Sequence, residues 1–576
     1  MLSYRKLAMC VLGRPLHTGG GIDSPRPASQ RAAAFILTAA MLITLTAPAF
    51  AETWYIENGD ITVKASGTEG KNTVSQGNKK DVEDTNTIIT NQNKDKASSN
   101  TVTIDAGNDK VEVTLKDVNI DTSSRNKAAV SVTGSGNTTI KLDGDNHLTG
   151  GNGIYSNSSG SLTISGDEND SLTAQGGDSR NGIYSVSGDV TISGGTVTAT
   201  GGNSTGSYGS GGDGIHSGSL TISGGTVTAT GGGSTGSNGL GGRGICSDSG
   251  GVTISGGSTV TANGGNGSDG ASGISSSSGV TVSDGTVTAN GGNGGNVSGD
   301  GIRSDGGITI SGGTVKAAGG DSKDGYGGDG IRSGGGVTIS GNTVNAAGGN
   351  GGKVGGYGIC SFDRVAISGG TVEAAGGSSG SSNGGSGIYS NDIDLSGSLE
   401  LTAKAGSPNG KALSQKGSEL DLNAIKDKLG PGAKVTATDA DGKVIAQVPI
   451  PRPVEPEEPV IPEESSSSSD GGSAAPSAPT SFLPGLTVTD KDDQRISYTS
   501  TQSGNTLTVC VGRLTASFRI SLAALRQLRA EGIEAITFQT ILCSTTLSVD
   551  ELLAMGGEDA EAVLTHRLTD SSLTVG

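Results

Sequence analysis

Residues Gly214–Gly232 read Gly-Ile-His-Ser-Gly-Ser-Leu-Thr-Ile-Ser-Gly-Gly-Thr-Val-Thr-Ala-Thr-Gly-Gly. The stretch holds three short runs in which apolar and polar residues alternate, and glycines separate the runs. Alternation with a period of two predicts β-strands that each present one apolar face. Strands this short bury too little apolar surface to be stable alone, so they must pack against further copies of the same unit.

The first of these runs belongs to a repeated word, Gly-Ile-X-Ser, which occurs nine times. Successive isoleucines of the word are separated by 28 to 32 residues, and a period in this range indicates stacked structural units. These isoleucines are Ile154, Ile183, Ile215, Ile245, Ile274, Ile302, Ile331, Ile359 and Ile388.

Aliphatic residues recur at matching places in every unit, for example the column Ile164, Ile192, Ile222, Ile254, Val282, Ile310, Ile339, Ile367 and Leu395. We therefore predict an all-β fold, a parallel β-helix with about 29 residues per coil, roughly triangular coils and a narrow aliphatic interior. The Gly-Gly pairs are expected to supply positive φ where the chain turns. A β-propeller blade needs four strands and about 40 residues, and the leucine and asparagine frame of leucine-rich repeats is missing.

The composition fits a thin core. Glycine accounts for 103 of the 576 residues and aromatic residues for only 3%, which argues against a large conventional globule. The net charge of −18 argues against nucleic acid as a partner, because phosphate backbones are bound by basic surfaces.

Residues 1–51 have the features of a secretory signal peptide. Basic residues precede an apolar run over residues 32–47, and Pro-Ala-Phe-Ala follows at 48–51, which predicts cleavage before Glu52. The alternative is a membrane anchor, but these sixteen residues are short for a span of about 20. We expect a secreted or cell-surface protein with no integral membrane segment once the signal is removed.

The rest of the chain divides by composition. The β-helix is expected over residues 52–448, with a surface excursion at 71–100 and, as a cap, a short helix at 422–429 followed by a last strand at 433–437. Residues 449–482 form a Pro/Ser-rich linker. Residues 483–576 predict a small α+β domain of unknown role with a hairpin around 503–505 and helices capped by Ser521 and Ser548. Cys510 and Cys543 in this domain are candidates for pairing.

The variable position of Gly-Ile-X-Ser is the best candidate for a binding site. Each X follows an inward isoleucine, so the X residues should face outward, one above the next. Tyrosine rings offer flat apolar faces to sugar rings, and arginines clamp carboxylates in a bidentate way. The alternative is an ordinary exposed strand face. The column reads Tyr155, Tyr184, His216, Cys246, Ser275, Arg303, Arg332, Cys360 and Tyr389.

A second column precedes each Gly-Ile pair and is rich in Asp and Asn. Asp300 and Asp329 lie on adjacent coils and are candidates to share a Ca²⁺ ion, which prefers several oxygen ligands. The alternative is that these side chains cap the turn before glycine.

The chain resembles the carbohydrate-binding parallel β-helix domains of secreted clostridial and related Gram-positive surface proteins. The resemblance covers about residues 100–448 and is carried by the leader, the entry segment Val113-Thr-Leu-Lys-Asp-Val-Asn-Ile-Asp and the Gly-Ile-Tyr-Ser, Leu-Thr-Ile-Ser and Thr-Val-Thr-Ala-Thr-Gly-Gly coils. It implies a right-handed parallel β-helix, binding of plant-type polysaccharides including acidic ones, and bound calcium. It transfers no individual binding residue.

Together these features favour non-catalytic binding of a polysaccharide, with acidic polymers among the candidates, through Tyr155, Tyr184, His216, Arg303, Arg332 and Tyr389. The rival interpretation is a structural stalk or adhesin that displays the C-terminal domain. A polysaccharide lyase is the third interpretation, but the chain has no Gly-His-Gly or Arg-Ile-Lys motif and its histidines are scattered, so we expect no enzyme.

Overall fold

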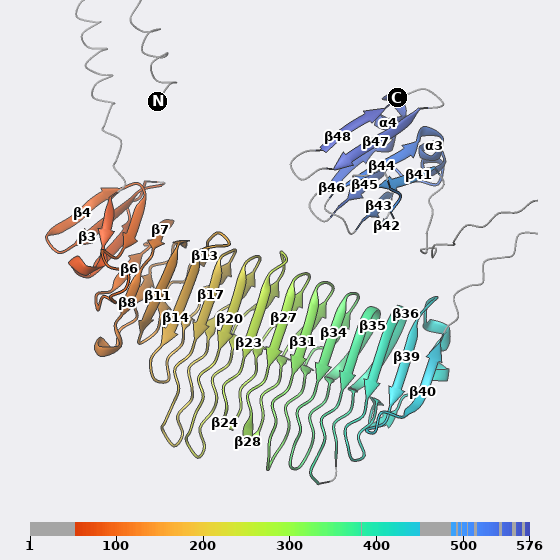
Figure 1. Ribbon diagram of the computed structural model, residues 1–576, viewed down its shortest axis with the longest axis horizontal. Coiled ribbons are helices and arrows are strands. Elements are labelled where there is room, and N and C mark those ends of the chain that lie inside the picture. Colours follow the sequence, from red (N-terminus) through yellow and green to blue (C-terminus); the bar gives the residue numbers. More distant parts are fainter. Residues whose placement is uncertain are drawn as a thin grey trace, which may run out of the picture. The chain divides into compact units, whose positions relative to one another are not determined.

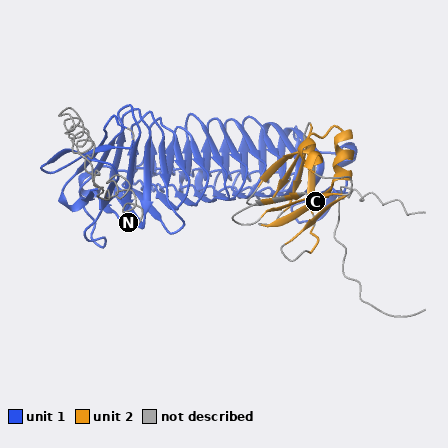
Figure 2. Cartoon of the chain, turned by 90° about the horizontal axis from the view of Figure 1, so that it is seen from above, with its two compact units in different colours: residues 1–456 blue, residues 457–576 orange. Residues whose placement is uncertain are grey.

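The computed structural model describes residues 52–449 except 69 and 382, and residues 485–575 with gaps at 491–493, 497, 504, 512–514, 541–543, 556–559 and 567–570. The chain divides into two compact units, residues 1–456 and 457–576 (Figure 2). The expected signal peptide, nearly all of the expected linker and Cys543 lie outside the described residues.

The first unit is a parallel β-helix of about 14 turns with a spacing of about 28 residues, as the sequence predicts (Figure 1). Each regular coil contributes one strand to each of three parallel sheets, and every strand pairs with its counterparts in the coils before and after. The prediction of stacked columns is confirmed by the register, because Ile154 pairs with Ile183 and Ile183 with Ile215. These isoleucines are fully buried in one continuous aliphatic core.

The first sheet carries the Gly-Ile-X-Ser words. Its strands are β2 (Ile61–Ala65), β6 (Val102–Asp105), β9 (Val130–Thr133), β12 (Ile154–Ser156), β15 (Ile183–Ser185), β18 (Ile215–Ser217), β21 (Ile245–Ser247), β25 (Ile274–Ser276), β29 (Ile302–Ser304), β32 (Ile331–Ser333) and β37 (Leu413–Gln415). Two long strands, β35 (Ile359–Ala375) and β36 (Ile388–Lys404), run through all three sheets near the C-terminal end of the β-helix.

The other two sheets complete each coil. The second sheet holds β1 (Thr53–Tyr55), β5 (Thr87–Thr90), β7 (Val111–Lys116), β10 (Thr138–Asp143), β13 (Leu162–Ser165), β16 (Val190–Ile192), β19 (Leu220–Ile222), β22 (Gly251–Ile254), β26 (Gly279–Val282), β30 (Gly307–Ile310) and β33 (Val337–Ile339). The third sheet holds β8 (Asn119–Asp121), β11 (Asp145–Gly150), β14 (Ser171–Gly176), β17 (Thr196–Thr200), β20 (Thr226–Thr230), β23 (Thr259–Asn263), β27 (Thr286–Asn290), β31 (Thr314–Ala318), β34 (Thr343–Ala347) and β39 (Lys434–Thr438).

Both ends of the β-helix are covered by antiparallel strands, which protects edges that would otherwise pair with other chains. At the N-terminal end, β3 (Asn72–Gln76) pairs antiparallel with β2, and β4 (Lys79–Asp84) pairs antiparallel with β3. The predicted surface excursion at 71–100 is therefore wrong, since Val74 is fully buried and β5 already belongs to the second sheet. Short 3-10 turns lie at η1 (Ile56–Asn58) and η2 (Ser123–Arg125).

At the C-terminal end, β40 (Val444–Pro449) pairs antiparallel with β39, and β38 (Ser418–Glu419) with β37. The cap that the sequence predicts is present, but its single short helix is wrong. Two 3-10 turns, η3 (Leu422–Ala424) and η4 (Lys426–Lys428), replace it, and Leu422, Ile425 and Leu429 pack onto the open end of the core. The segment follows the shape of the exposed core rather than a continuous helical face.

Glycine-rich arms join the third sheet of one coil to the first sheet of the next, and they stack on each other as closely as the strands do (Figure 1). The arms span residues 201–213, 231–243, 264–272, 291–300, 319–329, 348–357 and 376–386. Two of them contain short parallel strands, β24 (Gly267–Asp269) and β28 (Gly294–Val297).

A hydrogen-bonded ladder of backbone groups holds the arms together. The N–H of Gly212 donates to the carbonyl of Gly202 within one arm, Gly232 of the next arm donates to Gly212, and Gly242 donates to Gly232, each at 2.8 Å. A Cβ on Gly242 would lie 1.9 Å from the oxygen of Gly212, so a side chain cannot fit there. We call this series the glycine ladder.

The two kinds of Gly-Gly pair thus have different roles. Between the second and third sheets the second glycine does take positive φ, as at Gly225 (77°), and here the sequence-based expectation is confirmed. In the arms the glycines of the glycine ladder are required by close backbone approach instead, and the sequence pattern does not distinguish the two roles.

Within its described residues, the second unit has two four-stranded sheets and two helices. One sheet contains β41 (Leu486–Thr489), β44 (Ala516–Ser521), β47 (Glu561–His566) and β48 (Ser571–Val575), and the other contains β42 (Thr499–Ser503), β43 (Thr506–Cys510), β45 (Ala535–Gln539) and β46 (Ser544–Ser548). The predicted hairpin is the antiparallel pair β42–β43. Helix α3 (Leu522–Ala530) starts as predicted at Ser521, whose Oγ accepts a hydrogen bond from the N–H of Ala524 at 3.2 Å. Helix α4 (Val549–Met555) is the second helix.

None of the helices within the described ranges is both long enough and apolar enough to span a bilayer.

Candidate functional site

The X residues of the first sheet form one continuous column on the outside of the aliphatic core. The register pairs Tyr155 with Tyr184, Tyr184 with His216 and His216 with Cys246. It continues from Cys246 through Ser275, Arg303, Arg332 and Cys360 to Tyr389. The structure therefore places all six sequence-predicted binding residues in a single line along the helix axis.

This column is more covered than the sequence suggests. Cys246 and Cys360 are only 2% and 0% exposed. The side chain of His216 is 15% exposed, and those of Arg332 and Arg303 are 36% and 52% exposed. The loops and arms that precede the strands of the first sheet lie beside the column and cover part of it. The strand face is therefore less open than the sequence predicts.

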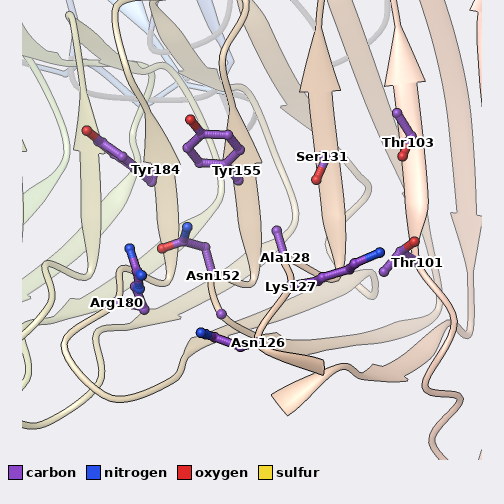
Figure 3. Close-up of a pocket in the computed structure, with 11 residues that line it drawn as sticks. Thr101, Thr103, Asn126, Lys127, Ala128, Ser131, Asn152, Tyr155, Arg180 and Tyr184 are labelled. Carbon is purple, nitrogen blue, oxygen red and sulfur yellow. The ribbon is translucent and has the colours of Figure 1, made fainter. Parts of the chain in front are cut away.

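The tyrosine end of the column lines a cleft of about 480 Å³. The ring centroids of Tyr155 and Tyr184 are 5.7 Å apart with a tilt of 49°, and His216 meets Tyr184 edge-on at 4.9 Å. Figure 3 shows the two tyrosines side by side on adjacent strands, with Asn152 and Arg180 below them and Lys127 further along. The cleft thus combines aromatic rings with two cationic side chains.

The arginine end lines a second cleft, of about 420 Å³, between the first sheet and three arms. Arg303 and Arg332 come from the sheet, whereas Val297, Tyr326 and Val354 come from the arms. Nη1 of Arg332 donates to Oδ2 of Asp329 at 3.0 Å. The guanidinium of Arg332 also lies 5.0 Å from the ring of Phe362, a cation–π contact that fixes its direction.

A stacked aromatic pair closes this end. The rings of Tyr357 and Tyr389 are 4.9 Å apart and inclined by only 18°. Tyr357 comes from the last residue of an arm, at the position occupied by Asp or Asn in most other coils. The two rings together form an aromatic surface that spans two coils.

The Asp and Asn residues before each Gly-Ile pair form a ladder of side-chain to backbone hydrogen bonds. Oδ1 of Asn152 accepts from the N–H of Asn181 at 2.9 Å, and Oδ1 of Asn181 accepts from Asp213 at 2.7 Å. In the same way Oδ1 of Asp300 accepts from the N–H of Asp329 at 2.8 Å. We call this series the Asx ladder.

Asp300 and Asp329 are both buried members of the Asx ladder. Asp329 uses Oδ1 to accept from the N–H of Tyr357 at 2.7 Å and Oδ2 to pair with Arg332. Burial, followed by the neighbouring charge of Asp329, raises the pKa of Asp300 to about 7. Burial likewise raises the pKa of Asp329. Both carboxylates accept hydrogen bonds from the backbone of the next coil, which differs from the local turn capping of the alternative interpretation. Calcium binding stays a prediction.

Between the tyrosine and arginine ends lies a polar cluster from two adjacent coils. Nδ1 of His216 is 2.7 Å from Oδ2 of Asp213, and Nε2 is 2.9 Å from Oδ2 of Asp248. The Sγ of Cys246 is 3.1 Å from Oδ1 of Asp248 and 3.4 Å from Nη1 of Arg243. Sequence reasoning identified His216 but missed this cluster.

The signal for the cluster is present in the sequence once the register is known. Asp-Gly-Ile-His at 213–216 is followed one coil later by Arg-Gly-Ile-Cys-Ser-Asp at 243–248. Sequence reasoning also missed three residues that line the two clefts, Arg180, Lys127 and Tyr326. No comparable signal marks them in the sequence, because they come from loops outside the repeated word.

No protein-family model, no curated protein and no solved structure matches this chain.

Proposed function

We propose that this is an exported, extracellular or cell-surface protein whose β-helix binds a polysaccharide without catalysing a reaction on it. The observation that carries the proposal is the alignment of two clefts along one column of X residues, one built on tyrosines and the other on arginines. The resemblance to carbohydrate-binding β-helix domains points to the same ligand class, and the leader-like residues 1–51 point to export.

The chemistry of the column suits an extended glycan. Tyrosine rings provide apolar faces for sugar rings at little cost in side-chain entropy, while hydroxyls and guanidinium groups at the cleft walls can hydrogen-bond sugar oxygens. Neighbouring coils are about 4.8 Å apart, so the column offers a repeating array of contacts to a repeating polymer. We expect the polymer to lie parallel to the helix axis.

Local charge favours an acidic polysaccharide even though the chain carries a net charge of −18. Lys127 and Arg180 line the tyrosine cleft, and Arg303 and Arg332 line the arginine cleft. Because the pKa of Asp300 is raised to about 7, the arginine cleft is less negative in mildly acid solution. Retention of an acidic glycan should therefore weaken as the pH rises through about 7.

Affinity electrophoresis of the full-length chain tests the proposal. Gels containing cellulose, pectin, polygalacturonate or mucin glycans are compared with a gel that lacks polymer, with added calcium and with chelator. Tyr184→Ala should weaken retention about 5-fold, because a stacking contact is worth on the order of 1 kcal/mol. Tyr208→Ala is the matched control, since Tyr208 is 81% exposed on an arm and lines neither cleft.

Unretarded migration on every gel, or equal loss in the Tyr184 and Tyr208 variants, would overturn the proposal. The structural stalk would then be the better interpretation. Retention that disappears with chelator would support the predicted calcium site at Asp300 and Asp329, whereas retention indifferent to chelator would contradict it. Release of unsaturated sugars absorbing in the ultraviolet would instead identify a lyase.

A further inference from the structure

The polar cluster in the middle of the X column brings together three side chains that bind metals. His216 and Cys246 are directly paired on adjacent strands of the first sheet, and Asp213 lies three residues before His216. One ligand atom from each of Asp213, His216 and Cys246 can be chosen so that all three lie within 4.8 Å of one another. It is the only group of three His, Cys, Asp or Glu residues with ligand atoms this close together among the residues that the structure describes.

We propose that Asp213, His216 and Cys246 bind a divalent transition-metal ion, with Zn²⁺ the best match. Imidazole nitrogen, thiolate sulfur and carboxylate oxygen are together the ligand set of zinc, whereas Ca²⁺ and Mg²⁺ prefer oxygen alone. Three protein ligands leave a fourth tetrahedral position for water. The proposal concerns a separate site from calcium binding at Asp300 and Asp329, and it does not depend on glycan binding.

Asp248 acts as the positioning residue of this site. With Nδ1 of His216 and the carboxylate of Asp213 directed to the ion, Nε2 of His216 keeps its 2.9 Å contact with Oδ2 of Asp248. A histidine ligand whose second nitrogen is held by a carboxylate has a fixed orientation and greater basicity. Asp248 is therefore expected to set affinity without contacting the metal.

The charges around the cluster balance when the ion is bound. The ion takes the place of the proton on Nδ1 of His216 and of the thiol proton of Cys246, and both protons leave to solvent. Burial raises the pKa of the Cys246 thiol, but the guanidinium of Arg243 opposes this effect at 3.4 Å from Sγ. Two carboxylates, one thiolate, one guanidinium and a divalent ion then sum to zero charge.

The chain contains a natural control for this site. Asp329, Arg332 and Cys360 occupy the same three positions, one coil step apart, as Asp213, His216 and Cys246. Both cysteines are free and buried, and both lie beside an Asp of the Asx ladder. The essential difference is that Arg332, which cannot bind a metal, replaces His216.

Co²⁺ titration of the reduced full-length chain under anaerobic conditions tests the proposal. We expect one equivalent to give a near-ultraviolet thiolate-to-cobalt band with visible bands of tetrahedral cobalt, and one equivalent of Zn²⁺ to abolish both. Cys246→Ser should remove the near-ultraviolet band, and His216→Gln should abolish tight binding. Cys360→Ser should leave the titration unchanged, because its coil lacks the histidine.

The role of Asp248 is tested by affinity and by spectrum together. Asp248→Asn should weaken Co²⁺ binding about 10- to 100-fold while the thiolate band still forms at saturation. Asp248→Glu should restore part of the affinity. Circular dichroism of every variant checks that the β-helix is intact.

Three results would overturn the proposal. They are a wild-type chain that gives no thiolate band, a Cys246→Ser variant that keeps the band, and a Cys360→Ser variant that loses it. None of these measurements involves a glycan, so failure here would leave the proposed polysaccharide binding standing, and failure on the affinity gels would leave the metal site standing.

Discussion

The aliphatic interior and the glycine-rich arms of the β-helix repeat with the same period but are stabilised by different interactions. In the interior, Ile, Val and Leu side chains of successive coils stack in a continuous core that excludes water. In the arms, backbone groups bond directly to backbone groups across the glycine ladder. The comparison shows that one repeat can carry two layers. The interior tolerates side-chain changes of equal volume, whereas the glycine ladder of the arms leaves no room for a side chain at positions such as Gly242.

The largest expected effect on the free energy of unfolding comes from a substitution in the aliphatic interior. Ile222→Ala removes a fully buried side chain from the second sheet and should lower the free energy of unfolding by about 2–5 kcal/mol. Thr221→Ala, on the outward face of the same strand, is the control and should change stability by no more than about 0.5 kcal/mol. Urea denaturation followed by circular dichroism measures both, and equal effects would contradict the core described above.

The next prediction concerns the arms. Gly242→Ala places a Cβ 1.9 Å from the carbonyl oxygen of Gly212 and should cost about 1–3 kcal/mol by forcing the glycine ladder apart. Gly233→Ala is the matched control, because a Cβ there would meet its nearest atom, the oxygen of Asn266, at 3.5 Å. Hydrogen exchange of the arm amides should accelerate in the first variant only. Unchanged exchange in Gly242→Ala would show that the ladder does not hold the arms.

The Asx ladder lies between the arms and the first sheet. The contribution of its buried member Asp300 to the stability of the β-helix should depend on pH. Its pKa is raised from 3.8 to about 7, so its contribution to stability is complete below about pH 3.8 and is lost as the pH rises to about 7. Asp300→Asn keeps an oxygen acceptor, as Asn152 and Asn181 do, but cannot ionise. The variant should gain stability relative to the wild type between about pH 4 and pH 8. Parallel stability curves over this range would refute the assignment.

The smallest effect on stability is expected at Asp60, whose exposed carboxylate lies just before β2, the first strand of the first sheet. Arg125 hydrogen-bonds both its oxygens, at 2.8 and 2.9 Å, and holds the pKa of Asp60 at about 2. Here the sign is opposite, because the contribution is complete above about pH 3.8 and is lost as the pH falls to about 2. Arg125→Gln should make the chain less sensitive to acid over this range. An unchanged acid midpoint would show that the pair contributes nothing measurable, which is common for exposed ion pairs.

Much of the fold follows from the sequence because strand alternation and a fixed period act locally and repeat. The repeated word alone places Ile183, Ile215 and Ile245 in one buried column, since in-register stacking is the arrangement that buries all of them. The wrong predictions fall where repetition stops. Residues 71–100 and 422–429 have no equivalent in other coils, and their conformations depend on covering the two open ends of the core.

The candidate site, like the fold, could be predicted from the sequence only in part. The order of Tyr155, Tyr184, His216, Arg303, Arg332 and Tyr389 along the column was determined by the sequence alone, because each follows an inward isoleucine of known register. The walls of the clefts and the distances within the cluster of His216 and Cys246 were decided only by the tertiary structure. The physical reason is that the arms follow contacts between backbones, so their course depends on neighbouring coils and leaves only a run of glycines in the sequence.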